Sequence, residues 1–324
     1  MKKFFFLRGR VALRIGLKLL NLNKNDELLI PSLICDTVIK ELREVGVKPK
    51  YYNINKKFIP IWADVKKKIS KKTKGLFMIN FFGKPQNRLR FRNFCDKNKL
   101  YLIEDNCHGF DGFHKKNQSS DILFSSPYKI IDKIDNGGVL IVNKKLIKKN
   151  EALKKMNKYR VTNYVKLKKK LKNFNYLKIF YRLMVKRPNY ESISIKNNEI
   201  IKDCYLDDKT INIINNFSFN KERKLRLSRF LKWKNKIKEF GLYPYFSYSN
   251  KNKYILWHLV VKVTDLRIRK KIFDWGWKNN VDIISWPSFP NNFNTKSTVF
   301  KFSRNFILFP LNKNYNDQIR KFKY

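Results

Sequence analysis

The chain has 324 residues, of which 43% are hydrophobic and 15% aromatic; this is enough apolar surface for well-filled cores and excludes a disordered protein. Its 73 Lys and Arg residues against 25 Asp and Glu residues give a net charge of +48, which suits an anionic partner such as nucleic acid, an acidic membrane surface or a phosphorylated substrate. The lysines are spread along the chain and accompanied by many Asn, Ile, Phe and Tyr residues. Compositional drift therefore explains the charge better than a nucleic-acid-binding surface does.

The first half of the chain alternates short apolar segments with segments of helical periodicity. We expect helices over 11–22, 37–45, 60–69 and 88–99, and strands over 27–31, 48–52, 73–80 and 101–104. This alternation is typical of parallel βαβ units, in which ligands bind at the carboxyl ends of the strands. The residues that follow these strands are therefore expected to meet in one crevice.

The second half of the chain differs in composition and in its pattern of apolar residues. From about 146 to 187 it is lysine-rich and helical, and its densest basic run, 166–172, predicts a solvated helix face or a weak contact with an anionic membrane surface. Beyond Pro188 we expect helices over 207–238 and 266–278, and strands over 254–263, 281–285 and 306–309. We therefore divide the chain into a large domain, residues 1–190, and a smaller C-terminal α/β domain, residues 191–324.

The cysteines and the apolar runs bear on the compartment. Four cysteines show no spacing typical of a metal site, so we expect no bound metal and free thiols in a reducing cytoplasm: Cys35, Cys95, Cys107 and Cys204. No apolar run approaches the roughly 20 residues that span a bilayer. The apolar stretch 4–7 is interrupted by Arg8 and Arg10, which argues against a signal peptide. We expect a cytoplasmic protein.

A carboxylate and a lysine stand out in the expected large domain. Asp105 ends the apolar segment 99–105, and Lys129 precedes the pair Gly137–Gly138. A carboxylate at a strand end and a lysine on a loop are what pyridoxal phosphate (PLP) chemistry requires, because the lysine forms the Schiff base and the carboxylate keeps the pyridine nitrogen protonated. The plainer interpretations are a solvated loop lysine and a turn-capping aspartate. The spacing to the glycine pair favours Lys129 over Lys133, and we expect a cationic, partly buried site to lower the pKa of Lys129.

Six segments in chain order carry a family resemblance: Arg8-Gly9-Arg10-Val11-Ala12-Leu13, 25–32, 80–85, Ile103-Glu104-Asp105-Asn106-Cys107-His108-Gly109, 121–138, and 286–287 with 303–311. Together they resemble the motifs of the DegT/DnrJ/EryC1/StrS sugar aminotransferases along nearly the whole chain. The resemblance implies an α/β fold, that of the fold-type I PLP-dependent transferases, with a mostly parallel central sheet flanked by helices in the large domain.

The resemblance also implies roles for individual residues. Lys129 would form the Schiff base and Asp105 would contact the pyridine nitrogen. The backbone of Gly9 and Arg10, at a helix start, would hold the cofactor phosphate, with Ser125 or Ser126 as a further donor unless both only shape the turn. His108 would lie by the phenolic oxygen or the ring face, the alternative being a buried core histidine. Cys35 stands where the family usually has an aromatic ring that stacks on the cofactor.

The implied function is transfer of an amino group from an amino acid, with glutamate as the expected donor, to a nucleotide-linked keto-sugar in surface polysaccharide or glycoconjugate biosynthesis. Because the family works as homodimers, we expect a homodimer, and no specific nucleic acid partner. Cys35, and Asp135–Asn136 in place of the acid before Gly137, motivate a second hypothesis: a PLP-fold protein without transaminase activity that acts as a binding or scaffold subunit. A dehydratase or isomerase with the same cofactor also stays open, although relatives that dehydrate typically replace the lysine with histidine.

Overall fold

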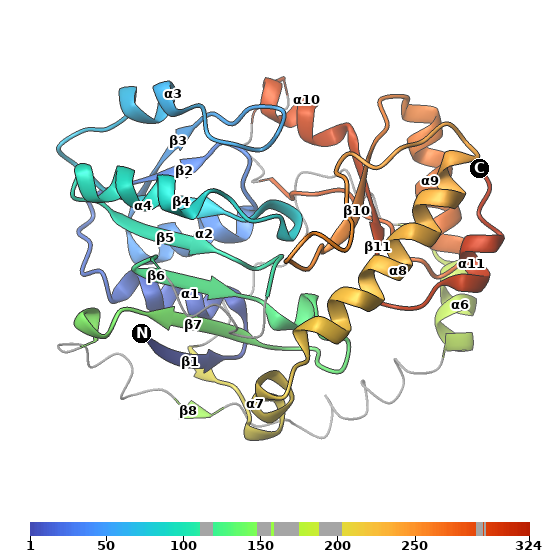
Figure 1. Ribbon diagram of the computed structural model, residues 1–324, viewed down its shortest axis with the longest axis horizontal. Helices are drawn as coiled ribbons and strands as arrows, with labels where there is room; N and C mark the ends of the chain where they lie inside the picture. The colour runs from blue at the N-terminus through green and yellow to red at the C-terminus, as the bar shows by residue number, and fades with distance from the viewer. Residues whose placement is uncertain (111–118, 148–156, 159–174, 188–202, 290–293, 295) are drawn as a thin grey trace. The chain divides into compact units, whose positions relative to one another are not determined.

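A computed structural model describes the chain except for residues 111–118, 148–156, 159–174, 188–202, 290–293 and 295. The chain forms two compact units, described separately below (Figure 1). Unit 1 comprises Met1–Tyr159, Lys196–Glu222 and Tyr254–Trp257, and unit 2 comprises Arg160–Ile195, Arg223–Lys253 and His258–Tyr324. The predicted domain boundary near residue 190 and the basic run 166–172 fall outside the described residues, so both stay predictions.

Among the described residues, unit 1 is built on a nine-stranded sheet with the order β3-β2-β4-β5-β6-β7-β1-β9-β8. Its strands are β1 (Lys2–Phe6), β2 (Glu27–Pro31), β3 (Lys48–Tyr52), β4 (Thr73–Ile79), β5 (Tyr101–Asp105), β6 (Ile122–Ser125), β7 (Gly138–Val142), β8 (Asn157–Lys158) and β9 (Cys204–Tyr205). The strands from β3 to β6 in this order are parallel, whereas β7 pairs antiparallel with both β6 and β1. The predicted mostly parallel sheet is therefore confirmed.

The carboxyl ends of the parallel strands meet at one edge of this sheet. There β5 ends at Asp105 and β6 ends at Ser125. Because β7 runs the opposite way, its first residue lies at the same edge, where Gly138 pairs with Phe6 at the end of β1. Residues that the sequence predicts to be functional therefore lie at this edge of the sheet.

Helices flank the sheet of unit 1. α1 (Gly9–Lys18) packs against β6 and β7, and α4 (Arg88–Lys97) packs against β4 and β5 (Figure 1). Side chains alternate along β5, so Leu102 and Glu104 share the α4 face of the sheet, while Ile103 and Asp105 lie on the other face. The unit also contains α2 (Asp36–Val45), α3 (Trp62–Lys67), α7 (Asp208–Asn215) and the 3₁₀ turns η1 (Phe81–Gly83), η2 (Pro127–Lys129) and η3 (Lys144–Leu146).

Unit 2 contains an antiparallel strand pair, β10 (His258–Lys262) and β11 (Phe306–Pro310). Its described helices are α6 (Asn175–Met184), most of α8 (Phe219–Lys238), α9 (Leu266–Lys278), α10 (Thr298–Arg304) and α11 (Asn316–Arg320). The fully buried Trp233 of α8 packs against Phe309 and Phe322, and its indole N–H donates to the Pro310 carbonyl at 3.2 Å. Unit 2 thus has an aromatic core of its own.

The structure corrects several predicted elements. The N-terminal strand β1 was not predicted, and the helix predicted over 207–238 is two helices, α7 and α8. The strand predicted over 254–263 is confined to His258–Lys262, because the backbone N–H of the preceding Trp257 donates to the Phe82 carbonyl of unit 1 instead of to a neighbouring strand. The predicted strand 281–285 does not form; Val281 and Ile283 are buried, and the half-buried Ile284 makes an isolated bridge to Leu308. Among the residues that the structure describes, no helix has the length and apolar composition needed to cross a membrane.

Candidate active site

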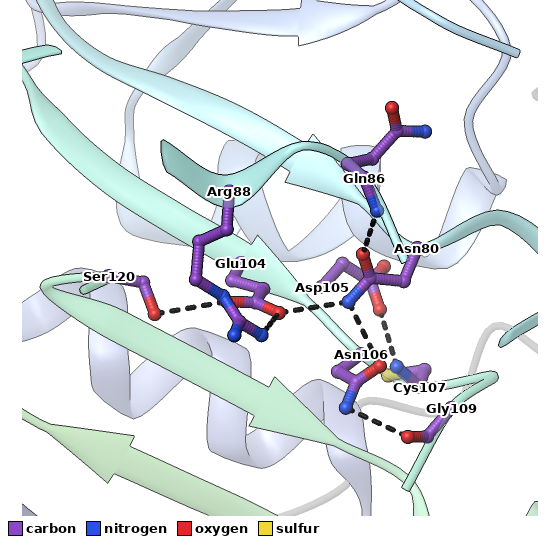
Figure 2. Close-up of polar contacts among 9 residues, drawn as sticks. All are labelled: Asn80, Gln86, Arg88, Glu104, Asp105, Asn106, Cys107, Gly109 and Ser120. Carbon is purple, nitrogen blue, oxygen red and sulfur yellow. Dashed lines mark hydrogen bonds and ion pairs between the residues drawn. The ribbon is translucent and has the colours of Figure 1, made fainter. Parts of the chain in front are cut away.

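The loop that follows β5 is fixed by a polar network around the fully buried carboxylate of Glu104 (Figure 2). The Arg88 guanidinium donates to it through Nε at 2.8 Å, and Asn80 Nδ2 and Ser120 Oγ donate at 2.9 and 3.2 Å. Asn80 Nδ2 also donates to Asn106 Oδ1, at 3.0 Å. With these donors the charge of Glu104 is compensated, so its role is to hold the ends of β4 and β5 in place.

Asp105, the next residue, lies on the opposite face of the sheet, where its carboxylate is buried. The Cys107 backbone N–H donates to Asp105 Oδ1 at 2.8 Å (Figure 2). Burial raises the pKa of Asp105, and the hydrogen bonds from Cys107 and the positive charge of Lys129 only partly offset this effect. A cation placed against this carboxylate would therefore relieve an existing cost of burial.

The start of α1 lies directly against the end of β6. A Cβ atom on Gly9 would fall 2.1 Å from Ser126 Oγ and 3.2 Å from the Ser125 carbonyl oxygen, so only glycine fits without displacing Ser126. Both serines are buried, and Ser126 Oγ donates to the Cys107 thiol at 3.2 Å. The first backbone N–H groups of α1 and the Ser126 hydroxyl thus lie side by side, an arrangement that suits an anionic group such as a phosphate.

Lys129 ends the 3₁₀ turn η2, next to this cluster, and its side chain is partly buried. Burial acts to lower the pKa of Lys129, but Tyr128, Cys107, Cys35 and Asp105 act to raise it, and the net direction is upward. The prediction that a cationic site lowers this pKa is therefore wrong. The groups that raise this pKa carry negative or ionisable oxygen and sulfur atoms, so they favour the charged form of the amine.

An aromatic stack covers this region. The Lys129 ammonium lies 5.0 Å from the centre of the Trp257 ring, and Trp257 stacks on the buried His108 ring, with ring centres 4.0 Å apart and an interplanar angle of 13°. The Trp257 backbone N–H donates to the Phe82 carbonyl at 2.7 Å, which fixes the segment in place. Trp257 lies more than a hundred residues from Lys129 along the chain, so the sequence carries no local signal of this contact.

The structure thus gathers seven of the eight predicted site residues at one edge of the sheet: Gly9, Cys35, Asp105, His108, Ser125, Ser126 and Lys129. The eighth, Arg10, is the second residue of α1, and its side chain acts electrostatically on Glu41 of α2. Only its backbone belongs to the start of α1 beside Ser126. The rival lysine, Lys133, is exposed.

Comparison with models of protein families shows to which family the chain belongs. The model of the DegT/DnrJ/EryC1/StrS aminotransferase family matches residues 7–176, which include Gly9, Asp105 and Lys129. The chain belongs to this family. The matched segment covers every predicted site residue and five of the six motifs noted in the sequence; the sixth, 286–287 with 303–311, lies outside it.

Individual relatives are distant. The chain is 31% identical over 98 residues to the GDP-perosamine synthase of Vibrio cholerae, which covers 30% of this chain and 27% of that protein. It is 30% identical over 145 residues to the 3-oxo-glucose-6-phosphate:glutamate aminotransferase of Bacillus subtilis, which covers 44% of this chain and 33% of that protein. The alignments thus span about a third or less of these curated relatives.

The similarity in fold extends further than the similarity in sequence. The structure of NtdA from Bacillus subtilis, solved with the bound cofactor PMP, superposes with a TM-score of 0.64 at 17% identity and covers 99% of this chain and 72% of that chain. The predicted fold class, that of the fold-type I enzymes, is thereby confirmed. At this level of identity the comparison establishes the fold alone.

Proposed function

We propose that this chain is a PLP-dependent aminotransferase that moves an amino group from an amino acid, with glutamate as the expected donor, to a nucleotide-linked keto-sugar for surface polysaccharide or glycoconjugate biosynthesis. The observation that carries the proposal is the convergence of Lys129, Asp105 and the Gly9–Ser126 pair at one edge of the sheet. Membership in the aminotransferase family supports the reaction, and the names of the relatives support a sugar as acceptor. We further propose a cytoplasmic homodimer.

The residues present fit PLP. The buried Asp105 carboxylate has a raised pKa that a facing cation would lower, which is what a protonated pyridine nitrogen provides. Gly9, where a Cβ would collide with Ser126, leaves the backbone of α1 and the serine hydroxyl open to a phosphate. Lys129 supplies the amine, within electrostatic range of Asp105. His108, stacked on Trp257, contributes a flat polar ring to the same region.

When bound, PLP supplies an electron sink for the carbon that loses its proton. Asp105 would hold the proton on the ring nitrogen, and the start of α1 with Ser126 would bind the phosphate. Lys129 would have two roles. Its Nζ would attach the cofactor and, once displaced by the donor amine, would move the proton between the substrate carbon and the cofactor carbon. Trp257 covers Nζ and would restrict the entry of water beside it.

A second candidate function rests on Cys35. The family usually places an aromatic ring at this position, and here the side chain is a thiol that contacts Thr37 Oγ1 at 3.6 Å. Asp135, which lies near the place of the family's acid before Gly137, is exposed. A chain with weakened cofactor binding would fit the alternative of a non-transaminating binding or scaffold subunit. The retained Lys129 and Asp105 favour the enzyme.

The two functions are separated by trapping the cofactor. The purified chain is mixed with PLP, its visible spectrum is recorded, and borohydride reduction is followed by peptide mapping. The enzyme proposal expects a visible band and a label on Lys129, both lost in Lys129→Ala and kept in the matched variant Lys133→Ala. Formation of 2-oxoglutarate from glutamate would then accompany amination of a nucleotide-linked keto-sugar. A label scattered over surface lysines would contradict the proposal and favour the binding subunit.

A further inference from the structure

The last described turn of helix α6 in unit 2 contacts its neighbour α9 and the segment after α9 through cationic side chains. The buried Arg182 donates to Asp282 at 2.7 Å, and its guanidinium lies 4.7 Å from the centre of the Trp277 ring. Just beyond the helix, Arg187 donates to Asp274 at 2.7 Å. The Trp277 indole N–H donates to the Arg182 carbonyl at 2.8 Å. The two arginines of this segment therefore point toward the rest of unit 2.

The outward side of α6 is correspondingly apolar. Phe180, Tyr181, Leu183 and Met184 are 63%, 56%, 64% and 73% exposed. A surface helix of a water-soluble protein normally turns such residues toward the core and its charges toward water. Among the described side chains of α6, Arg182 is buried and the large apolar residues contact water, and adjacent apolar side chains of this size mark a surface that binds a partner. We call these four residues the α6 apolar face.

Exposed lysines occur on the two segments next to the α6 apolar face in the fold. Lys186 is exposed just after the helix, and α9 contributes the exposed Lys270, Lys271 and Lys278. The carboxylates of Asp274 and Asp282 are already paired with arginines, and Lys270 also pairs with Asp274 at 3.2 Å, so Lys186, Lys271 and Lys278 supply the border. The surface therefore combines an apolar patch with a cationic border, within a chain whose net charge is +48.

We propose that the α6 apolar face and its lysine border bind an anionic phospholipid surface. Amphipathic helices bind bilayers by burying an apolar face among the acyl chains while cations meet the phosphate groups. With 10 residues, α6 is about 15 Å long, so it lies in the plane of the interface and does not cross it. A second copy of this chain fits less well, because it would bring the same lysines into contact with one another. The proposal is independent of the proposed catalytic activity.

The test is sedimentation of the full chain with two kinds of vesicle, phosphatidylcholine alone and phosphatidylcholine mixed with phosphatidylglycerol. We expect binding to the anionic vesicles, weakened by salt, and little binding to the neutral ones. The double variant Phe180→Ser, Met184→Ser should lower the partition coefficient on anionic vesicles about tenfold or more. Leu89→Ser is the matched control, because Leu89 on α4 of unit 1 is 69% exposed and should not affect binding.

Three outcomes would overturn the proposal. The first is no binding of the unchanged chain to anionic vesicles. The second is binding that Phe180→Ser, Met184→Ser leaves intact, because the contact would then be one of diffuse charge alone. The third is a mass in solution, without vesicles, that falls from dimer to monomer in this variant, because a second copy would then cover the face. Circular dichroism of the variants shows whether they fold, and the single variant Met184→Ser, whose side chain is 73% exposed, tests the face if the double variant does not fold.

Discussion

Glu104 and Asp105 are adjacent carboxylates at the end of β5 that point to opposite faces of the sheet. They differ in how far neighbouring donors of the protein compensate their negative charges. Glu104 is fully buried and receives donors from Arg88, Asn80 and Ser120. Asp105 is buried with a raised pKa, and the backbone N–H of Cys107 is its closest described donor. The first carboxylate is satisfied by the protein itself, whereas the second is better satisfied by a cationic ligand.

Glu104→Gln should destabilise the chain. The variant keeps the size of the side chain but leaves the Arg88 guanidinium without its carboxylate, at a cost of about 2–4 kcal/mol. The measurement is the free energy of unfolding from urea titration. The control Arg88→Met removes the other partner, and the double variant should cost less than the sum of the two single changes. A loss below about 0.5 kcal/mol in Glu104→Gln would contradict this account.

Asp105→Asn should leave the stability of the cofactor-free chain unchanged or raise it, and should weaken the binding of PLP. A carboxyl group whose pKa is raised in the folded state favours folding in its protonated form, so stability falls as pH rises through the ordinary value of 3.8 and the raised value. Asparagine removes this loss and can still accept from the Cys107 N–H. The cofactor-free variant should therefore melt at the same or a higher temperature than the unchanged chain at neutral pH, with a difference that shrinks in acid. Binding of PLP should weaken strongly; unchanged binding would remove Asp105 from the proposed site.

Attachment of PLP at Lys129 should be favoured by alkaline pH. The pKa of this amine is raised by Tyr128, Cys107, Cys35 and Asp105 against the effect of burial, so in the cofactor-free chain it is protonated at neutral pH. Only the neutral amine attacks a carbonyl group, and the loading rate should therefore keep increasing up to and beyond the ordinary lysine pKa of 10.5. Stopped-flow absorbance gives this rate. A plateau near pH 7 would show that a neighbouring group accepts the proton from Lys129.

The sheet of unit 1 could be predicted from the sequence because strands and helices are marked by patterns of neighbouring residues. The apolar runs at 27–31 and 73–79 alternate with helical periodicity, and the site residues follow strand ends, so one edge of a parallel sheet brings them together. β1 was missed because Lys2–Phe6 is short and its pairing with β7 spans more than a hundred residues. The Trp257–Lys129 contact and the upward pKa of Lys129 were missed for the same reason: both depend on neighbours that only the folded chain assembles.

Cys35→Tyr should strengthen cofactor binding. The thiol lies within electrostatic range of Lys129, where the family usually has an aromatic ring, and an added stacking contact provides about 0.5–1.5 kcal/mol. The dissociation constant for PLP, measured by titration of the visible band, should fall by about two- to tenfold. Cys35→Ser is the control and should bind as the unchanged chain does. If tyrosine weakens binding while serine does not, the cofactor ring is not stacked at this position.

Gly138→Ala should disrupt the connection between the sheet and the start of α1. A Cβ at this position would lie 2.1 Å from the Arg8 carbonyl oxygen and 2.6 Å from the Gly9 nitrogen, both backbone atoms that cannot rotate away. The strand pair β1–β7 must then shift and carry Gly9 with it. We expect a loss of about 2 kcal/mol or more in the free energy of unfolding, together with weaker binding of PLP through its phosphate.

The control for this substitution is Gly241→Ala. Gly241 has a positive φ of 68°, but no heavy atom lies within 4 Å of the position of its Cβ, so alanine there costs only the backbone strain of about 1 kcal/mol. Gly241 belongs to unit 2, whereas Gly9 and Ser126 belong to unit 1, and its variant should bind PLP normally. Equal losses of stability in the two variants, with cofactor binding unchanged in both, would show that the close approach at Gly138 does not position Gly9.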